Sequence, residues 1–418
     1  MVTAADQETR RDVAWAEARR FAHEAASPAP PVRVALGRAA GLTLAQDLVV
    51  ATPLPAFDTS AMDGFAVSGA GPWTIAGSAR PGRPWTGERL AAGQAVEIST
   101  GAVVPPGTWA VLPVESAAVR DDRVALAGEP GVAHDGPDAV PGEPAAVRGG
   151  RAAAVPGEPA AAHHGGFAVP GLARGKHIRY AGEDAPAGAC LAPAGTPVGP
   201  ALLGLAATCG YDELLVRRAP AVVAIVTGDE LATNGLPGPG RVRDALGPLL
   251  PSLIAELGGR LDGLVHVPDQ PVAALAEAVE SAAGADAVVV TGSTSVGVTD
   301  GLRRLLAERD ARWIVDSVAC RPGHPALLAR PRGGPYVVGL PGNPFAALTA
   351  AHTLLGPLLA GLSGRALGDL PQAPLLSRIV VPAGRTRIVP VAVPRSHRPD
   401  RPNARWASDG KSLPRGSA

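Results

Sequence analysis

Aromatic residues make up only 3 % of this 418-residue chain, and its net charge at pH 7 is zero. A balanced charge gives no support to nucleic-acid binding, which usually shows as a basic excess. No run of about 18 apolar residues is present, so we expect no membrane span. The first 26 residues carry charges throughout and lack the apolar stretch of a signal peptide, which predicts a cytoplasmic protein.

Cysteine is also scarce. Cys190, Cys209 and Cys320 lie far apart and form no C-x-x-C pair, so reduced thiols are expected rather than disulfides or a zinc site. Hydrophobic residues nevertheless make up 46 % of the chain, which is enough for sizeable cores. At about 100–200 residues a domain, the length allows two to four domains.

Composition changes along the chain. Residues 7–25 have apolar positions at helical spacing, and residues 65–115 alternate β-like stretches with glycine, which indicates a small all-β module. Residues 127–173 repeat the sequence AVPGEPAA and are dominated by Gly, Pro and Ala. Such a composition buries too little apolar surface to offset its ordering entropy, so a flexible insertion is expected there.

From residue 221 onward, apolar strands alternate with helices. AVVAIVTGDE, ADAVVVTGSTSVG and YVVGLPGNP each read as a buried strand that runs into a polar loop. Continuous apolar strands between helices predict a parallel sheet covered on both faces. The tail returns to a β pattern and then becomes polar and Pro-rich.

The loops after these three strands suit a phosphate-bearing ligand, because ligands of open α/β sheets bind beyond the carboxyl ends of the strands. Glycines allow close approach of the backbone, and the third loop opens a helix whose N-terminus attracts anions. Each loop alone is more often only a turn. Neither G-x-x-x-x-G-K-[ST] nor G-x-G-x-x-G is present, so ordinary nucleotide and dinucleotide folds are disfavoured. The loop residues are Thr227, Gly228, Asp229 and Glu230; 291–297; and Pro341, Gly342, Asn343 and Pro344.

Several loop carboxylates could hold Mg²⁺, which uses one or two carboxylates together with substrate phosphates. For Asp58, Asp184 and Glu230, a role as a turn or cap residue is equally open. Arg321 and His324 flank a Pro-Gly turn and are suited to an oxyanion, although solvated charges on a plain turn are the alternative. The carboxylates considered are Asp63, Glu183, Asp184, Asp229, Glu230 and Asp300.

Seven sequence motifs carry a resemblance to a known family, and their order and spacing agree with it. They are LPAFDTSAMDGFAV, STGAVVPPGTWAVLPVES, HIRYAGEDAPAGACLAPAGTPV, VAIVTGDEL, TGSTSVGVTDGLRRLL, RPGHP and GLPGNPFAAL. The chain resembles the molybdopterin molybdenumtransferase (molybdenum insertase) family, which is related to the E domain of gephyrin. The resemblance runs from the N-terminal helix to about residue 390, apart from the insertion.

The resemblance implies a multi-domain α/β plus β protein that forms a homodimer. The α/β core is of the molybdopterin-binding type and shares its fold with molybdopterin-adenylylating enzymes, one of which is implied as a partner. The implied boundaries are 1–53 with 174–218 for an elongated dimerisation or linker domain, 54–126 for the β module, 127–173 for the insertion, 219–368 for the α/β domain and 369–418 for an incomplete C-terminal β domain.

The implied reaction inserts molybdate into adenylylated molybdopterin, with Mg²⁺, and releases AMP. Matching the motifs residue by residue gives Asp63, Glu183, Asp229 and Asp300 as catalytic, the last two also as metal ligands. Asp58 and Ser60 resemble supports of Asp63. The implied substrate-binding residues are Ser60, Thr100, Gly101, Thr227, Gly228, Ser293, Ser295, Gly297, Arg321, His324, Pro341, Gly342 and Asn343.

The chain departs from the family pattern at three places. GSTSVG stands where GGVSVG is usual, RPGHP where KPGKP is usual, and RDALGP keeps Asp244 but lacks the usual Asn. These departures keep a second hypothesis open, a diverged non-catalytic relative that binds the pterin cofactor or serves as a scaffold. A generic phosphate-ester hydrolase is a weaker third hypothesis, because such an enzyme would not need the β-module motifs.

Overall fold

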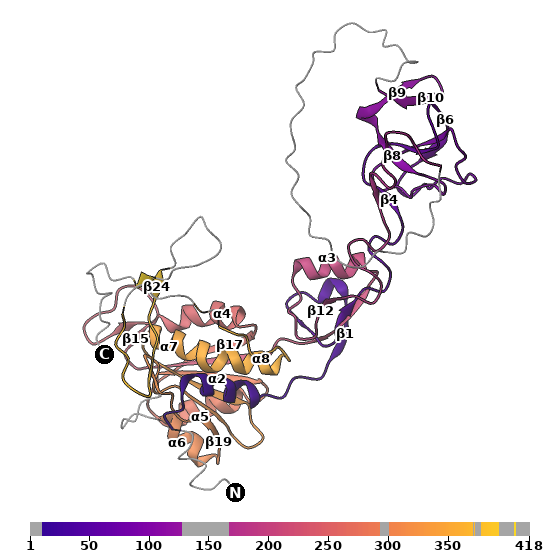
Figure 1. The fold of residues 1–418 in the computed structure, drawn as a ribbon. Helices are drawn as coiled ribbons and strands as arrows, with labels where there is room; N and C mark the ends of the chain where they lie inside the picture. The colour runs from indigo at the N-terminus through magenta and orange to yellow at the C-terminus, as the bar shows by residue number, and fades with distance from the viewer. Residues whose placement is uncertain are drawn as a thin grey trace. The chain divides into compact units, whose positions relative to one another are not determined.

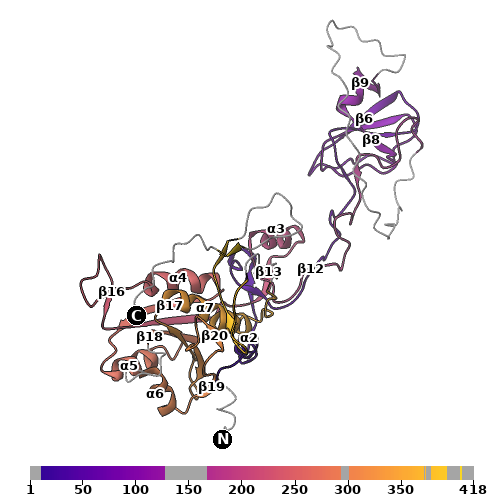
Figure 2. The same ribbon diagram turned by 60° about the vertical axis from the view of Figure 1, so that its left-hand side comes forward.

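A computed structural model describes residues 11–127, 167–292, 301–370, 372, 378–392 and 405–406. The chain forms two compact units, which are treated separately here. The first unit comprises Met1–Leu48, Ala192–Ala207 and Tyr211–Ala418, and the second comprises Val49–Leu191 with Thr208–Gly210. Most of the predicted insertion, residues 128–166, lies outside the described residues. Figures 1 and 2 show the elements from two directions.

A six-stranded sheet forms the centre of the first unit, in the order β17-β14-β18-β22-β21-β19 (Figure 1). The first four strands are parallel, as predicted, but β21 runs antiparallel to both neighbours. Five residues join β21 to β22, too few for the crossover that a parallel pair needs, so the sheet is mixed at this edge, which the sequence pattern did not predict. The bounds are β14 (Ala221–Thr227), β17 (Arg260–Val267), β18 (Ala287–Gly292), β19 (Arg312–Val315), β21 (Leu327–Arg330) and β22 (Tyr336–Pro341).

Helices cover both faces of this sheet. Alternate residues of β14 face opposite ways, so that Val226 packs into one core and Ile225 into the other. On the face of Val226 lie α2 (Trp15–Glu24), α4 (Leu246–Glu256), α7 (Pro344–Ala350) and α8 (Gly356–Leu362), and on the face of Ile225 lie α5 (Val272–Ser281) and α6 (Gly301–Glu308) (Figures 1 and 2). The predicted helix-covered sheet is therefore present.

The N-terminal helix starts later than the sequence pattern suggests. Its first turn begins at Trp15, because Val13 forms a strand-like bridge with Val318 and donates its N–H to the Ser317 carbonyl at 3.0 Å. Trp15 Nε1 then donates to Thr353 Oγ1 at 2.9 Å, which fixes the helix against the core. Residues 7–10 of the predicted helix lie outside the described part of the chain.

One continuous helical segment, Pro344–Leu362, contains α7, a π-helical turn η3 (Ala351–Leu355) and α8. By length and composition it could cross a membrane, the one such helix in the described ranges. However, 72 % of its apolar window is buried inside the first unit, as in the core helix of a globular domain.

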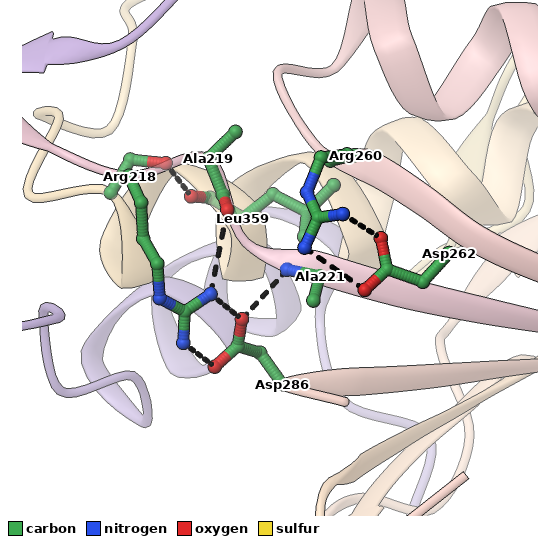
Figure 3. Close-up of polar contacts among 8 residues, drawn as sticks. Arg218, Ala219, Ala221, Arg260, Asp262, Asp286 and Leu359 are labelled. Atoms are coloured by element: carbon green, nitrogen blue, oxygen red, sulfur yellow. Dashed lines mark hydrogen bonds and ion pairs between the residues drawn. The ribbon is translucent and has the colours of Figure 1, made fainter. Parts of the chain in front are cut away.

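Ion pairs lie at the edge of the sheet where β14, β17 and β18 begin (Figure 3). The loops predicted to bind a phosphate follow the opposite ends of the strands. Arg218 donates to Asp286, with Nη2 2.7 Å from Oδ1, and the Ala221 N–H donates to Asp286 Oδ2 at 2.7 Å. Arg260 pairs with Asp262 at 2.6 Å. Burial alone would raise the pKa of Asp286, but its hydrogen bonds from Arg218 and Ala221 outweigh burial and lower it.

Asp286→Ala is expected to lower the free energy of unfolding by about 1–3 kcal/mol, because it leaves the Ala221 N–H and Arg218 without their acceptor. Since the folded-state pKa lies below the ordinary value of about 3.9, Asp286 stabilises the fold above that pH and loses this effect as pH falls through the lowered pKa. Urea titrations at pH 7 and below pH 4 should show a difference between wild type and variant that shrinks in acid. Asp262→Ala, at a more local and exposed pair, is the control, with an expected cost of about 0–1 kcal/mol.

Short elements complete the first unit. Three strands form an antiparallel sheet in the order β1-β13-β2. The 3₁₀ turn η1 lies between β1 and β2 in the chain, and helix α3 precedes β13. In the C-terminal region only two-residue strands occur among the described residues, so the predicted shortened β domain stays a prediction. The bounds are β1 (Val32–Ala35), η1 (Leu36–Arg38), β2 (Thr43–Leu44), α3 (Pro200–Thr208), β13 (Glu213–Arg217), β15 (Leu231–Ala232), β16 (Val242–Arg243), β20 (Cys320–Arg321), β23 (Thr386–Arg387), β24 (Val391–Ala392) and β25 (Arg405–Trp406).

The second unit is built on a six-stranded sheet in the order β8-β5-β7-β6-β10-β9, β-structure as predicted for this stretch. Its core is centred on the buried Trp73. Shorter strands form two further pairs, β4 with β11 and β3 with β12. The bounds are β3 (Leu48–Val49), β4 (Thr59–Ser60), β5 (Gly64–Ser68), β6 (Trp73–Ala79), β7 (Gln94–Ile98), β8 (Ala110–Pro113), η2 (Val114–Ser116), β9 (Ala117–Arg120), β10 (Arg123–Leu126), β11 (Ile178–Arg179) and β12 (Cys190–Ala192).

Candidate functional site

The carboxyl ends of β14, β18 and β22 lie next to one another, because the three strands are parallel neighbours. From β14 the chain passes to β17 on one side and then to β18 on the other, so the strand order switches between β14 and β18. Ligands of open α/β sheets bind at such a switch point, beyond the carboxyl ends. We call this region the carboxyl edge.

Thr227, Gly292 and Gly342 meet at the carboxyl edge. Thr227 Oγ1 donates to the Thr291 carbonyl at 2.7 Å, and Gly292 has a φ of +100°. A Cβ atom on Gly292 would lie 2.6 Å from Thr227 Oγ1, and one on Gly342 would lie 3.7 Å from Gly292 Cα. Glycine at position 292 is therefore required for the ends of β14 and β18 to approach this closely.

Asn343 starts helix α7 at the same edge. Its Oδ1 accepts a hydrogen bond from the Ala346 N–H at 3.1 Å, and Pro344 occupies the first helical position. This arrangement is a helix N-cap, which explains the G-N-P sequence in local terms. Since the N-terminus of the continuous helix 344–362 lies beside Gly342, its dipole adds a positive field at the edge.

One hydrogen bond joins the loops that follow β14 and β17. The Asp229 N–H donates to Asp269 Oδ2 at 3.4 Å; Asp229 is exposed and Asp269 is half-buried. Gly228 precedes Asp229 with a φ of +148°, and a Cβ atom there would lie 2.8 Å from Glu230 Oε2. The structure thus places Thr227, Gly228, Asp229, Pro341, Gly342 and Asn343 in one region of the first unit, as the strand pattern predicted.

The donor set at this edge fits Mg²⁺ better than a metal held by protein alone. In the described ranges, no group of three or more His, Cys, Asp or Glu side chains is arranged to hold a metal ion. Mg²⁺ needs only one or two carboxylates and completes its shell with waters and substrate phosphates. Asp229 and Asp269 are the acids of the two loops that this edge brings into contact. Asp300, Ser293, Ser295 and Gly297 lie outside the described residues.

Arg321 lies in a parallel two-residue pairing of β20 with β23, in which it is the register partner of Arg387. Both side chains are exposed. The Arg387 Nη1 donates to the Val380 carbonyl at 3.3 Å. Register partners of adjacent strands point to the same side, so the two arginines lie on one face of this pairing. A guanidinium group is suited to an oxyanion.

His324 is tied into the loop that carries it. Its Nδ1 lies 2.9 Å from the Val318 carbonyl, which can only accept, so Nδ1 carries the proton. Asp12 Oδ1 lies 3.3 Å from the same nitrogen. The Nδ1 side of the ring therefore holds the turn together, and only Nε2 is left to face a ligand.

In the second unit, Asp63 is fixed by Thr100. The Thr100 N–H donates to Asp63 Oδ1 at 2.7 Å and the Thr100 hydroxyl donates to the same oxygen at 3.1 Å. The backbone hydrogen bond, followed by the hydroxyl, lowers the pKa of Asp63 below its ordinary value. Asp63 is thus an exposed carboxylate that stays ionised and is held in one orientation.

The other polar residues of this stretch fix its backbone. The Ser60 hydroxyl donates to the Met62 carbonyl at 2.6 Å, and the Gly101 N–H donates to the Ser60 carbonyl at 2.8 Å. Asp58 Oδ1 accepts from the Ala181 N–H at 2.7 Å. These hydrogen bonds therefore order the backbone around Asp63. Thr100, rather than Ser60, holds the Asp63 carboxylate itself.

Glu183 folds back on its own turn. Its Oε2 accepts a hydrogen bond from the Tyr180 N–H at 3.0 Å, three residues earlier. One carboxylate oxygen is consequently engaged in capping the turn. The contact explains an acid at this position in structural terms, and its catalytic role stays a prediction.

Two family models match consecutive parts of the chain. Residues 13–210 match the MoeA N-terminal region (domain I and II), and residues 223–361 match the probable molybdopterin binding domain. The chain is 31 % identical over 352 residues to "Molybdopterin molybdenumtransferase 2" of Mycobacterium tuberculosis, covering 79 % of this chain and 74 % of that protein. The chain belongs to the molybdopterin molybdenumtransferase family.

Other molybdopterin molybdenumtransferase relatives agree. The chain is 30 % identical over 378 residues to the molybdopterin molybdenumtransferase of Synechococcus elongatus, covering 86 % of this chain and 83 % of that one. It also shares its fold with the molybdopterin biosynthesis MoeA protein of Pyrococcus horikoshii OT3, at a TM-score of 0.67 and 20 % identity, covering 96 % of this chain and 91 % of that chain. The predicted family is confirmed.

The motifs of the molybdopterin molybdenumtransferase family did not single out Asp269 or Arg387. The structure places Asp269 beside Asp229, and it pairs Arg387 with Arg321. Asp269 follows β17 by two residues, so the rule that singled out the ends of the other strands would have found it. Arg387 offers no such signal, because only the pairing of β20 with β23 brings it to Arg321.

Proposed function

We propose that this protein is a molybdenum insertase that transfers molybdenum from molybdate to adenylylated molybdopterin and releases AMP. In the net reaction, water cleaves the phosphoanhydride of the adenylylated substrate and AMP leaves. Molybdate exchanges one oxo group for the two dithiolene sulfurs, and that oxygen leaves as water with the two thiol protons, so the oxidation state of molybdenum does not change. Family membership supports the substrate class, since relatives at 31 % and 30 % identity carry the name molybdopterin molybdenumtransferase.

The observation that carries the proposal is the meeting of Thr227, Gly292 and Gly342 at the switch point of the sheet. A phosphate group there would accept hydrogen bonds from strand-end backbone N–H groups and lie near the positive end of the helix that starts at Pro344. In our proposal this region binds the phosphoanhydride, and Asn343 keeps the helix N-terminus in place.

Asp229 and Asp300 are the proposed Mg²⁺ ligands, with Asp269 as an additional acid beside Asp229. Mg²⁺, when bound, would neutralise the negative charge of the phosphate oxygens and so ease cleavage of the phosphoanhydride. Asp63, ionised and oriented by Thr100, and Glu183 are proposed as further catalytic residues, as the family resemblance implies. Measuring AMP release from adenylylated molybdopterin, with molybdate and Mg²⁺ present, tests this function.

Molybdate is proposed to bind at Arg321 and Arg387, with His324 Nε2 nearby. The usual family sequence KPGKP has two lysines, whereas here only Arg321 keeps a permanent charge. Arg387, the register partner of Arg321, is proposed to supply the second charge from a different part of the chain. Two guanidinium groups present planar sets of N–H donors that match a tetrahedral oxyanion.

Arg321→Ala is expected to raise the molybdate concentration for half-maximal AMP release by about 10-fold or more, since a hydrogen bond to a charged group contributes about 1.5–3 kcal/mol. Arg387→Ala should act in the same direction. The KM for adenylylated molybdopterin should change little. Arg332→Ala, in the exposed turn before β22, is the matched control and should leave both constants unchanged; equal effects of all three variants would exclude a specific oxyanion site.

We also propose a homodimer, and an interaction with a molybdopterin adenylyltransferase that supplies the substrate. Light scattering coupled to size-exclusion chromatography measures the first directly, with a mass of twice 41.9 kDa expected. Co-elution with an adenylyltransferase from the same organism tests the second.

A further inference from the structure

Asp244 is an almost fully buried carboxylate, with its side chain only 4 % exposed. Its Oδ1 accepts hydrogen bonds from the Leu246 and Gly247 N–H groups, both at 2.9 Å, and so caps the start of α4. Its Oδ2 lies 2.8 Å from Nε2 of His266 on β17. Burial raises the pKa of Asp244, but the hydrogen bonds from Gly247, His266 and Leu246 outweigh burial and lower it.

Neighbouring residues are adapted to this contact. A Cβ atom on Gly247 would lie 2.2 Å from Asp244 Oδ2 and 3.3 Å from His266 Nε2, so any larger residue would push the pair apart. His266 is the register partner of Val226, one residue before the end of β14. The pair therefore lies one strand away from the switch point.

Asp244 also holds the acidic loop that follows β14. Its N–H donates to the Ala232 carbonyl at 3.0 Å, and two residues earlier the Val242 N–H donates to the Glu230 carbonyl at 2.8 Å. The guanidinium of Arg241 donates to the Leu231 carbonyl. These contacts fasten residues 230–232, directly after Asp229, to the segment that ends in the buried carboxylate.

β17 consequently meets the acidic loop at two points. His266 reaches it through Asp244, and Asp269, three residues later, accepts from the Asp229 N–H at 3.4 Å. The second contact is long and exposed, whereas the first is short and ends on a buried carboxylate. The first is thus the stronger constraint on where the loop lies.

We propose that Asp244 and His266 are positioning residues that hold the loop carrying Asp229 at the carboxyl edge. The proposal rests on the proposed function for the role of Asp229. Neither residue contacts the substrate in this account. Both act by fixing the loop between the end of β17 and the start of α4. The Asp229 N–H then stays beside the Asp269 carboxylate before any metal ion binds.

The first test compares His266→Leu with His266→Gln. Leucine removes the donor to Asp244, whereas the glutamine amide keeps one in a similar place. The Mg²⁺ concentration for half-maximal AMP release should rise about 10-fold in His266→Leu and return towards wild type in His266→Gln, as for residues that orient metal ligands. His352→Leu, at an exposed histidine in the π-helical turn in the middle of the helical segment 344–362, should change nothing.

A double-mutant cycle asks whether the effect runs through Asp229. In an Asp229→Asn background, His266→Leu should cost little further activity, because the group it positions is already impaired. Full additivity of the two substitutions would overturn the proposal.

Trypsin cleavage after Arg241 and Arg243 provides a readout that needs no substrate. His266→Leu should speed cleavage at these two sites several-fold relative to other sites, while His266→Gln and His352→Leu should match wild type. Unchanged cleavage in His266→Leu would overturn the positioning role. If the wild-type protein releases no AMP, the proposed function fails, but this measurement still decides whether the pair holds the loop.

Discussion

Replacing Asp63 by asparagine is expected to slow AMP release by about 10²–10³-fold, the loss typical of removing a preorganised charged or polar group from an active site. Asparagine has nearly the same volume, and its carbonyl oxygen still accepts from the Thr100 N–H. The substitution therefore removes the charge and keeps the geometry set by the 2.7 Å contact. Rates with saturating substrate, molybdate and Mg²⁺ give the comparison.

Two controls accompany the Asp63 variant. Asp122→Asn removes an exposed carboxylate elsewhere in the β module and should leave the rate unchanged. Circular dichroism and the urea midpoint of Asp63→Asn should match wild type, because the side chain is exposed and its hydrogen-bond acceptor is retained. A variant that unfolds, or one that turns over normally, would assign Asp63 a structural role or none.

Gly292→Ala is the second variant with a large expected effect. Its new Cβ would lie 2.6 Å from Thr227 Oγ1 and 2.9 Å from the Thr227 carbonyl, at a φ of +100° that alanine rarely adopts. The ends of β14 and β18 must therefore move apart. A misplacement of about 1 Å can cost about 100-fold in rate, and we expect at least that loss of kcat/KM for adenylylated molybdopterin.

Gly333→Ala separates the backbone cost of Gly292→Ala from its effect on the site. Gly333 also has a positive φ, +71°, but a Cβ there would meet nothing within 4 Å. It lies before β22, at the opposite end of that strand from Gly342. Both variants should lose about 1–3 kcal/mol of stability from backbone strain, and only Gly292→Ala should lose activity. Equal losses of activity would show that stability, not the carboxyl edge, limits turnover.

The strand ends were predictable from sequence because two simple signals coincide. Continuous apolar runs give buried parallel strands, and glycine with polar residues directly after them marks the ends where ligands bind. These signals correctly located Thr227, Gly342 and Asn343 at one edge. They could not show that β21 turns back antiparallel, since its four residues look the same in either direction.

The supporting contacts were not predictable, because each joins residues that are distant in sequence. Thr100 holds Asp63 across 37 residues, and His266 reaches Asp244 across 22. Arg387 comes to Arg321 only when two short strands pair. Motif resemblance therefore predicts which residues form the site, whereas the orientation of their side chains follows from tertiary packing that no local pattern encodes.

One measurement tests the central claim, that the protein couples AMP release to molybdenum insertion. Purified protein is mixed with adenylylated molybdopterin, Mg²⁺ and increasing molybdate, and AMP is quantified alongside the reconstitution of a molybdenum-dependent apo-enzyme. The account predicts that AMP and active cofactor appear together, in equal amounts, and only with molybdate present. Tight binding of the adenylylated substrate with no AMP release at any molybdate concentration would contradict it and favour a binding or scaffold protein.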